Sequence, residues 1–354
     1  MAYHVVAQLP DAQELKEEFP PDIPRVLADR DAIRAVLAGR DPRLMFIVGP
    51  CSAWPPDRVE EYSDRLVELQ DRVREKLLLV LRCYIQKPRT VLGWTGIINQ
   101  PNPLAPPDIA KGIRTSAKMM ANVSQQLPVA DEMLFTHNAD YFGDYLSYAA
   151  LGARSSEDPE HRYIASLFEP PMGVKHGTDG DLRKGVNSVQ AVQAGHDLAL
   201  GNKHIATSGN HYAHLILRGS EHGPNYHPAA VALAKKLLLE QGRRIRNPAI
   251  VIDASHDNSL NGDGKDPTIQ KFVVKSVLQA MFDQRAEYSL VRGFMVESFL
   301  YGGNQKIRPG MGEDGLSITD PCLSWEETQK LLLETADALD QGNRLLERSE
   351  WSDA

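Results

Sequence analysis

Two groups of side chains in this chain of 354 residues have types suited to chemistry. The first group is basic, and each member lies at or shortly after the end of a short apolar run. Its members are Arg82, Lys87, Arg89, Arg154, Lys175 and Arg218. Positive charges that converge on one place repel each other unless an anion lies among them. If the fold brings these residues together, they predict a pocket for a doubly or triply charged small substrate.

The second group offers a mixed set of metal ligands. It consists of Cys51, His256, Glu297 and Asp320. A thiolate, an imidazole and two carboxylates suit a divalent transition metal such as Mn, Fe, Co or Zn. Their wide separation in the sequence argues against a finger-type structural site and favours a metal that polarises a carbonyl group. Taken singly, Cys51 is more simply interpreted as a packed core thiol, and His256 as a loop residue bonded to backbone.

The elements that must position these groups follow an alternating pattern. Short apolar runs alternate with amphipathic stretches that have helical spacing. The apolar runs are 44–48, 77–81, 128–134, 148–153, 172–175, 214–217, 249–252 and 293–296, and the helical stretches include 58–79, 107–126, 227–241, 268–285 and 325–341. Continuous apolar strands alternating with helices predict a parallel sheet, and eight repeats favour a closed (β/α)8 TIM barrel. A doubly wound sheet fits the same pattern less well.

A barrel would bring both groups to one mouth, because reactive side chains gather at the carboxyl ends of its strands. Glu132, at the third run, joins them there. Residues 1–43 are predicted to form an N-terminal arm with one helix at 31–39, residues 44–345 the catalytic barrel, and residues 346–354 a C-terminal tail. The proline-rich stretch 99–107 is predicted to be a loop.

Composition limits the partners and the compartment. The 47 acidic and 39 basic residues give a net charge of -8, so no overall field attracts nucleic acid or anionic lipid. No run approaches the roughly 20 apolar residues of a membrane span, and the first residues lack the pattern of a signal peptide. Three cysteines are too few for a disulfide framework. We therefore expect a cytoplasmic protein that binds neither nucleic acid nor membrane.

Several motifs, in order along nearly the whole chain, carry a family resemblance. They include VGPCSAW at 48–54, LRCYIQKPRTVLGW at 81–94, LGAR at 151–154, GVKHGTDG at 173–180, ILRG at 216–219, IDASHDNS at 252–259, VESFLYGGNQ at 296–305 and SITD at 317–320. The chain resembles the type I 3-deoxy-D-arabino-heptulosonate 7-phosphate (DAHP) synthases. The resemblance implies a (β/α)8 homodimer or homotetramer that opens the shikimate pathway. Its reaction would condense phosphoenolpyruvate with erythrose 4-phosphate and water and release phosphate.

The resemblance also implies a role for each matching residue. The metal, expected to be Mn, Fe or Co, would be held by Cys51, His256, Glu297 and Asp320. Phosphoenolpyruvate would be held by Arg82, Lys87, Arg154, Lys175 and Arg218, and the sugar phosphate by Arg89 and Thr90. Lys175 is a candidate proton donor, and Glu132 or a water on the metal could activate the water that attacks phosphoenolpyruvate. Catalytic roles thus fall on Lys175, Glu132, Lys87, Cys51 and His256.

Departures from the family pattern keep two alternatives open. Gln86 replaces the usual Glu before Lys87, and Trp54 and Pro55 replace a His-Asp pair. Further changes occur at 134–135 and 139–141. Because every inferred phosphoenolpyruvate contact is present, these changes bear more on the second substrate. One alternative is a paralogue in specialised metabolism that uses a different phosphorylated aldehyde; the other is a catalytically silent barrel that binds a partner.

One segment bears on regulation. Relatives are commonly inhibited by an aromatic amino acid, with help from a hairpin before the sixth strand. The corresponding residues, 190–207, read as a shortened, helix-like segment without the alternating apolar residues of a ribbon. Glu169, followed by Pro170 and Pro171, would also alter an amino-acid pocket. We therefore predict that Phe, Tyr and Trp do not inhibit appreciably.

Overall fold

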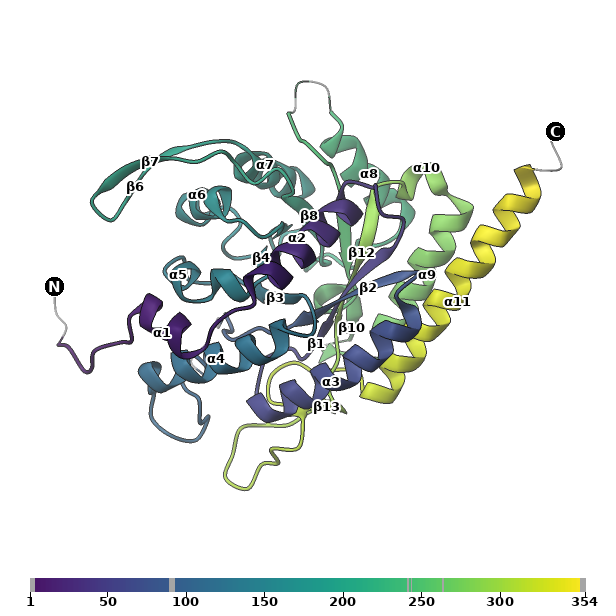
Figure 1. Cartoon of the computed structure of the whole chain (residues 1–354). Coiled ribbons are helices and arrows are strands. Elements are labelled where there is room, and N and C mark those ends of the chain that lie inside the picture. The colour runs from purple at the N-terminus through teal and green to yellow at the C-terminus, as the bar shows by residue number, and fades with distance from the viewer. Residues whose placement is uncertain (1–3, 89–92, 241, 243, 263, 351–354) are drawn as a thin grey trace.

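Eight parallel strands close into a barrel surrounded by helices (Figure 1), as the alternating pattern predicts. The strands are β1 (Leu44–Gly49), β2 (Leu77–Arg82), β3 (Val129–Glu132), β4 (Tyr148–Leu151), β5 (Met172–Lys175), β8 (His214–Leu217), β9 (Ile250–Asp253) and β12 (Val291–Glu297). This computed structural model describes residues 4–88, 93–240, 242, 244–262 and 264–350. Arg89 and Thr90, predicted to bind the sugar phosphate, lie outside the described residues. The predicted TIM barrel is confirmed.

The strands contain continuous apolar runs because both of their faces are covered. Seven of the eight are buried at every residue, and in β12 only Arg292 is partly exposed. The barrel closes where β1 pairs with β12, with Met45 opposite Gly293 and Gly49 opposite Glu297. The rings of Phe46 and Phe294 pack across this seam with centroids 5.0 Å apart. Packing on both faces fixes the height at which each strand ends and so positions the residues that follow.

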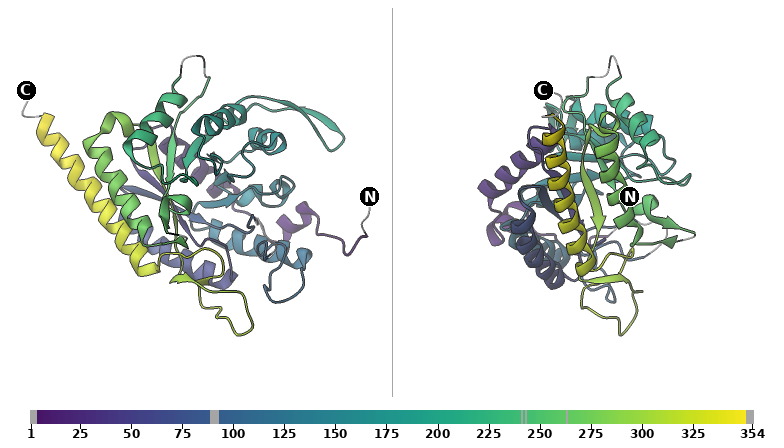
Figure 2. Two further views of the ribbon diagram at one scale, coloured as in Figure 1. Left: turned by 180° about the vertical axis from the view of Figure 1, so that it is seen from behind. Right: turned by 90° about the vertical axis from the view of Figure 1, so that its right-hand side faces the viewer.

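Helices cover the outside of the barrel. The main ones are α3 (Pro56–Val73), α4 (Ile109–Ser124), α6 (Pro159–Leu167), α7 (Leu182–Gln193), α8 (Pro228–Leu238), α9 (Ile269–Asp283) and α11 (Trp325–Glu350). Asp108, Asp158 and Asp181 cap α4, α6 and α7 by accepting hydrogen bonds from backbone N–H groups of the first turn. Short helices α5 (Asn138–Phe142) and α10 (Arg285–Tyr288) fill connections, and the long α11 runs beside α9 (Figure 2).

The N-terminal arm differs from the sequence expectation. It forms two helices, α1 (Ala12–Glu18) and α2 (Ile23–Leu37), whereas one helix at 31–39 was predicted. Helix α2 starts earlier because Asp22 caps it and Pro24 fits its first turn. Its apolar stripe is obscured by the buried charged residues Asp29 and Arg30. The fully buried Ile33 joins the cluster of residues that closes the amino end of the barrel.

Residues 190–207 also correct a prediction. They contain the end of α7 and a β-hairpin made of β6 (Asp197–Leu200) and β7 (Lys203–Ala206), which extends away from the barrel (Figure 1). The expectation that this segment forms no ribbon is therefore wrong. An apolar face was the wrong criterion, because both strands are largely exposed. A tight turn with Gly201 at φ +58° and the contact of His204 with Asp197 at 3.0 Å support the pairing instead.

Two smaller paired segments lie in the loops that follow β9 and β12. The first is the hairpin of β10 (Leu260–Asn261) and β11 (Gly264–Lys265), and the second joins β13 (Tyr301–Asn304) to β14 (Leu316–Ser317). Both shape the carboxyl end of the barrel. Across the described part of the chain, the helices are too short or too polar to span a bilayer.

Candidate active site

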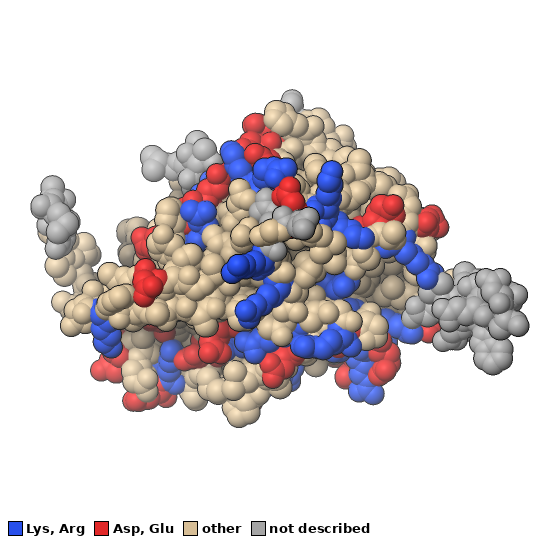
Figure 3. Space-filling view, turned by 90° about the horizontal axis from the view of Figure 1, so that it is seen from above, with Lys and Arg blue, Asp and Glu red and all other residues tan. Residues whose placement is uncertain are grey.

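A cavity of about 380 Å³ opens at the carboxyl ends of the strands. The residues predicted to be functional that line it are Lys87, Glu132, Arg154, Lys175, Arg218, His256 and Asp320. Asp257 and Lys265, which the sequence did not single out, line it as well. The outer surface seen from above differs, because acidic and basic side chains are interspersed across that face (Figure 3). The structure therefore brings most of the predicted charges into one pocket.

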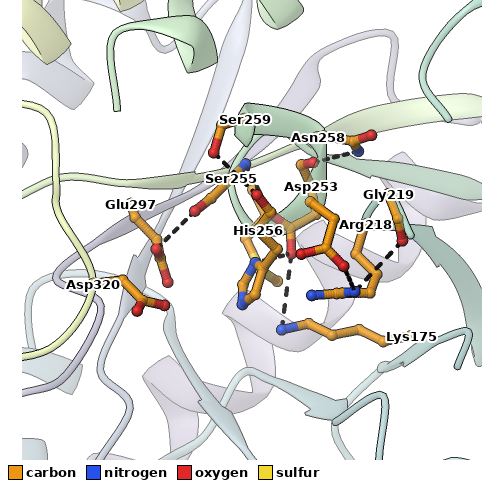
Figure 4. A network of polar contacts seen from close by, with 12 residues as sticks. Lys175, Arg218, Gly219, Asp253, Ser255, His256, Asn258, Ser259, Glu297 and Asp320 are labelled. Atoms are coloured by element: carbon orange, nitrogen blue, oxygen red, sulfur yellow. Dashed lines mark hydrogen bonds and ion pairs between the residues drawn. The ribbon is translucent and has the colours of Figure 1, made fainter. Parts of the chain in front are cut away.

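Three of the four predicted metal ligands, Cys51, Glu297 and Asp320, form a close group, which we call the donor group. One donor atom each from Cys51, Glu297 and Asp320 lies within 4.8 Å of the others. Cys51 follows β1, Glu297 ends β12 and Asp320 follows β14. His256 faces the same cavity but is not a member of that group; its Nδ1 lies 2.8 Å from Oδ2 of Asp253 (Figure 4). Strands distant in sequence thus supply a thiol and two carboxyl groups to one point.

Glu297 is held as a buried carboxylate. Arg82 donates from Nη2 to its Oε1 at 2.7 Å, and both side chains are 0% exposed. Ser255 donates from Oγ to the other carboxylate oxygen at 2.7 Å. Burial raises the pKa of Glu297, but Arg82 and the neighbouring cations outweigh burial, and the pKa lies well below its ordinary value. Glu297 is therefore ionised and oriented before any ligand binds.

Arg82 has a different placement from the one the resemblance implies. Its guanidinium lies behind Glu297, 3.8 Å from the centre of the Tyr84 ring, and it does not line the cavity. Nε donates to the carbonyl oxygen of Pro50 at 3.1 Å. These contacts hold Arg82 against Glu297, and its role as a ligand of phosphoenolpyruvate stays a prediction.

Burial and nearby charges set the protonation of the other two kinds of donor, the Cys51 thiol and the His256 imidazole. Burial, followed by the charge of Glu297, raises the pKa of the Cys51 thiol, so its sulfur keeps a proton until a cation arrives. Burial and the positive charges of Lys175 and Lys265 lower the pKa of His256 well below 6.5. His256 is therefore a neutral imidazole, which is the form that binds metals.

Lys175 and Glu132 form a buried pair in the cavity. Nζ of Lys175 donates to Oε2 of Glu132 at 2.9 Å and lies 3.8 Å from Oδ2 of Asp253. Burial raises the pKa of Glu132, but the charges of Lys175 and Lys87 lower it by a larger amount. The net pKa of Glu132 is therefore below its ordinary value. The pair thus places a proton donor and a proton acceptor side by side.

Arg218 and Lys87 present donors to the same space. The Arg218 guanidinium pairs with Asp257, while its buried Nε has no hydrogen-bond partner among the described residues. Lys87 donates from Nζ to the carbonyl oxygen of Cys51 at 2.8 Å. Arg154, in the loop after β4, also lines the cavity. A buried donor without a partner indicates a place for an anionic ligand.

Sequence reasoning missed several residues that shape this site. Asp257 pairs with Arg218, and its position next to His256 was the signal that could have revealed it. Nε2 of His176 accepts from the backbone N–H of Arg218 at 3.3 Å and from Asn225 at 2.7 Å. No sequence signal pointed to Lys265, because its contact depends on a hairpin that residue periodicity does not predict.

Comparisons with known proteins agree with this geometry. Residues 17–333 match the model of the DAHP synthetase I family. The chain belongs to this family. It is 37% identical to the Tyr-sensitive phospho-2-dehydro-3-deoxyheptonate aldolase of Salmonella typhimurium over 91% of this chain and 90% of that protein. The phospho-2-dehydro-3-deoxyheptonate aldolase of Corynebacterium glutamicum is 36% identical over 96% of this chain and 93% of its own length.

A solved structure of a DAHP synthetase I relative has the same fold. The phospho-2-dehydro-3-deoxyheptonate aldolase of Francisella tularensis superposes with a TM-score of 0.87 and 31% identity. The match covers 95% of this chain and 99% of that one. The family suggested by the motifs is thereby confirmed, and all of the predicted site residues fall within the matched range.

Proposed function

We propose that this chain is a DAHP synthase, which condenses phosphoenolpyruvate with D-erythrose 4-phosphate and water to give DAHP and phosphate. The observation that carries the proposal is the cavity itself, where Lys87, Arg154, Lys175 and Arg218 surround a space beside the Cys51 donor group. Family membership favours this reaction over a different aldehyde or a silent barrel. The reaction is the first step of the shikimate pathway.

The basic residues would hold phosphoenolpyruvate by its carboxylate and phosphate. Guanidinium groups bind such oxygens through paired hydrogen bonds, and the unpartnered Nε of Arg218 is one donor ready for them. Lys87 and Arg154 line the same cavity and add charge. Holding both ends of the molecule would fix one face of C3 towards the aldehyde, which accounts for much of the expected rate enhancement.

The donor group fits a divalent metal. A thiol and two carboxyl groups within 4.8 Å of each other match the ligands of Mn, Fe or Co, which we propose as the cofactor. Cys51, Glu297 and Asp320 would hold the ion, with His256 as the fourth ligand proposed from the family motif. Such an ion acts as a Lewis acid towards a carbonyl oxygen.

The Lys175 and Glu132 pair would move the protons. As C3 of phosphoenolpyruvate forms a bond to the aldehyde carbon, the C2=C3 double bond supplies the electron pair and leaves C2 electron-poor, and Lys175 donates a proton to the aldehyde oxygen. Glu132 takes one proton from the water that adds to C2. The C–O bond between C2 and the phosphate then breaks as the C2 hydroxyl becomes the ketone, and the proton of that hydroxyl leaves with the phosphate. Because Nζ and Oε2 are 2.9 Å apart, the proton on Glu132 can return to Lys175 and restore both groups.

We propose that the protein works in the cytoplasm as a homodimer or homotetramer. The three cysteines are buried and unpaired, which suits the reducing cytoplasm. A homodimer or homotetramer would cover exposed apolar residues of the arm such as Val5 and Val6, which are 69% and 87% exposed. Light scattering during size-exclusion chromatography would measure the subunit number.

The test is phosphate release from phosphoenolpyruvate with a panel of phosphorylated aldehydes. We expect rapid release with erythrose 4-phosphate, loss of activity after chelation, and recovery with Mn²⁺, Fe²⁺ or Co²⁺. Release only with another aldehyde would identify a paralogue, and no release with any aldehyde would identify a silent barrel. Full activity of metal-free protein would refute the proposal that the reaction needs a divalent metal. The Arg183→Ala variant is a suitable control, because Arg183 is an exposed residue of α7 that pairs with Glu240, just after α8 on the outside of the barrel.

A further inference from the structure

Lys265 places a positive charge on the proposed metal-ligand group. It ends the β10–β11 hairpin, and its Nζ forms an ion pair with Oδ2 of Asp320. The side chains are 23% and 39% exposed, so the pair lies at the edge of the cavity. The contact connects the loop after β9 with the loop after β12.

The electrostatic influence of Lys265 extends to the whole donor group. Lys265 pairs with Oδ2 of Asp320, and one donor atom each of Asp320, Cys51 and Glu297 lie within 4.8 Å of one another. The ammonium therefore supplies positive charge at the carboxylate that a metal would use. A divalent ion bound by the same three residues would carry a like charge close to the Lys265 ammonium.

Lys265 differs from the other cation bound to this group. Arg82 is fully buried behind Glu297 and is held by several further contacts, so it can stay in place when a metal binds. Lys265 has a long flexible stem, is partly exposed and makes its polar contact with the ligand residue itself. It can leave Asp320 without breaking the barrel.

From these contacts we infer that Lys265 is a built-in competitor for the metal: its ammonium occupies Asp320 in the metal-free protein and is displaced when the metal binds. The inference rests on the proposed metal site. A competitor that must be displaced reduces apparent affinity, and a displaced ammonium that stays nearby reduces it further by repulsion. Both effects have the same sign, so removing the charge must tighten metal binding.

The experiment compares Mn²⁺ binding by calorimetry to chelator-treated wild type, Lys265→Met and Lys265→Arg at one pH and salt concentration. Met keeps an unbranched side chain without the charge, whereas Arg keeps the charge. We expect Lys265→Met to bind Mn²⁺ on the order of tenfold more tightly, and Lys265→Arg to bind like the wild type. The matched control is Lys275→Met, which removes the exposed 2.7 Å ion pair with Glu334 on α11 and should change nothing.

The outcomes separate this inference from the proposed function. A Cys51→Ala variant that binds Mn²⁺ as well as wild type, or a wild type that binds none, refutes the metal site and the inference together. Loss of binding in Cys51→Ala combined with unchanged or weaker binding in Lys265→Met overturns the inference alone. Thermal unfolding of each variant, measured without metal, verifies that the folded protein is being titrated.

Discussion

The two ends of the barrel contain buried polar groups of different kinds. At the carboxyl end, Arg82 and Glu297 form an ion pair 2.7 Å apart with both side chains 0% exposed. At the amino end, Tyr148 and His214 are equally buried, but their contact is a neutral hydrogen bond of 2.9 Å. Helix α2 closes that end with Ile33.

The charged pairs at the carboxyl end serve function, whereas the neutral contacts at the amino end serve stability. Burying two charges costs about as much desolvation energy as their attraction returns, so the carboxyl-end pairs are weak evidence for stability. They hold charge where a substrate and a metal need it. The contacts at the amino end are neutral and only need to exclude water. Substitutions at the two ends should therefore affect different measurements.

Replacing Lys175 tests the carboxyl end most strongly. Lys175→Met removes the proposed proton donor and should reduce turnover roughly 10²- to 10⁴-fold. It also leaves the buried Glu132 without its 2.9 Å partner, which should cost about 3–5 kcal/mol of unfolding free energy. Steady-state phosphate release and urea unfolding measure the two effects.

A double variant distinguishes the two consequences. In Lys175→Met with Glu132→Gln, the unpaired charge is gone, so most of the stability should return while turnover stays low. Recovery of turnover with stability would show that the pair is structural. Wild-type turnover in the single variant would remove Lys175 from the mechanism.

Replacing Arg218 tests the anion-binding part of the same end. Arg218→Ala should weaken phosphoenolpyruvate binding by roughly 2–5 kcal/mol, a change of more than about 30-fold, because charge-assisted contacts are lost in a buried site. The Michaelis constant and direct calorimetric titration measure it. Kinetics equal to those of the wild type would place Arg218 outside the substrate pocket.

Replacing Ile33 tests the amino end. Ile33 is 0% exposed in the cluster beneath the barrel, and Ile33→Ala should reduce the unfolding free energy by about 2–5 kcal/mol through the cavity it leaves. The Michaelis constants and turnover of the folded protein should stay within about twofold of wild type, since stability effects at distant sites are independent of the site chemistry. A selective loss of turnover would contradict the division between the two ends.

His214 gives the amino end a pH dependence. Burial lowers its pKa from 6.5 to about 4. The unfolded chain therefore binds the proton more readily between these values, so stability is complete above pH 6.5 and is lost as pH falls towards 4. From pH 7.5 to 5 this group should remove about 2 kcal/mol of unfolding free energy.

A His214→Gln variant isolates the contribution of His214 protonation to the free energy of unfolding. Gln keeps a polar side chain near Tyr148 but cannot take up the proton, so the difference in unfolding free energy between wild type and variant should shrink by about 2 kcal/mol at pH 5. Urea unfolding at both pH values measures it. A difference that stays constant with pH would show that His214 does not titrate on unfolding.

The predictions from sequence worked where burial on both faces imposes a pattern. All eight barrel strands, and the meeting of Lys87, Glu132, Lys175 and Arg218 at one mouth, follow from apolar runs that end in charge. Asp257 and Lys265 could not be predicted because their roles depend on contacts across loops. The β6–β7 hairpin was missed because exposed strands carry no apolar alternation.

The smallest expected effect concerns that hairpin. Although the ribbon exists, we still predict that Phe, Tyr and Trp inhibit by less than about twofold. A cavity of about 660 Å³ between the hairpin, α5 and α6 is lined by Asp140, Glu160 and Asp197, and its described lining includes neither Lys nor Arg. The carboxylate of an amino acid would therefore meet like charge there without an opposing one. Glu169, which the sequence predicts to alter such a pocket, does not line this cavity and pairs with Arg30 at 3.5 Å. Titrating each amino acid into the phosphate-release assay at low phosphoenolpyruvate tests the prediction. Saturable inhibition at sub-millimolar concentration, lost in an Asp197→Ala variant, would show that the hairpin cavity binds the amino acid through its ammonium group instead.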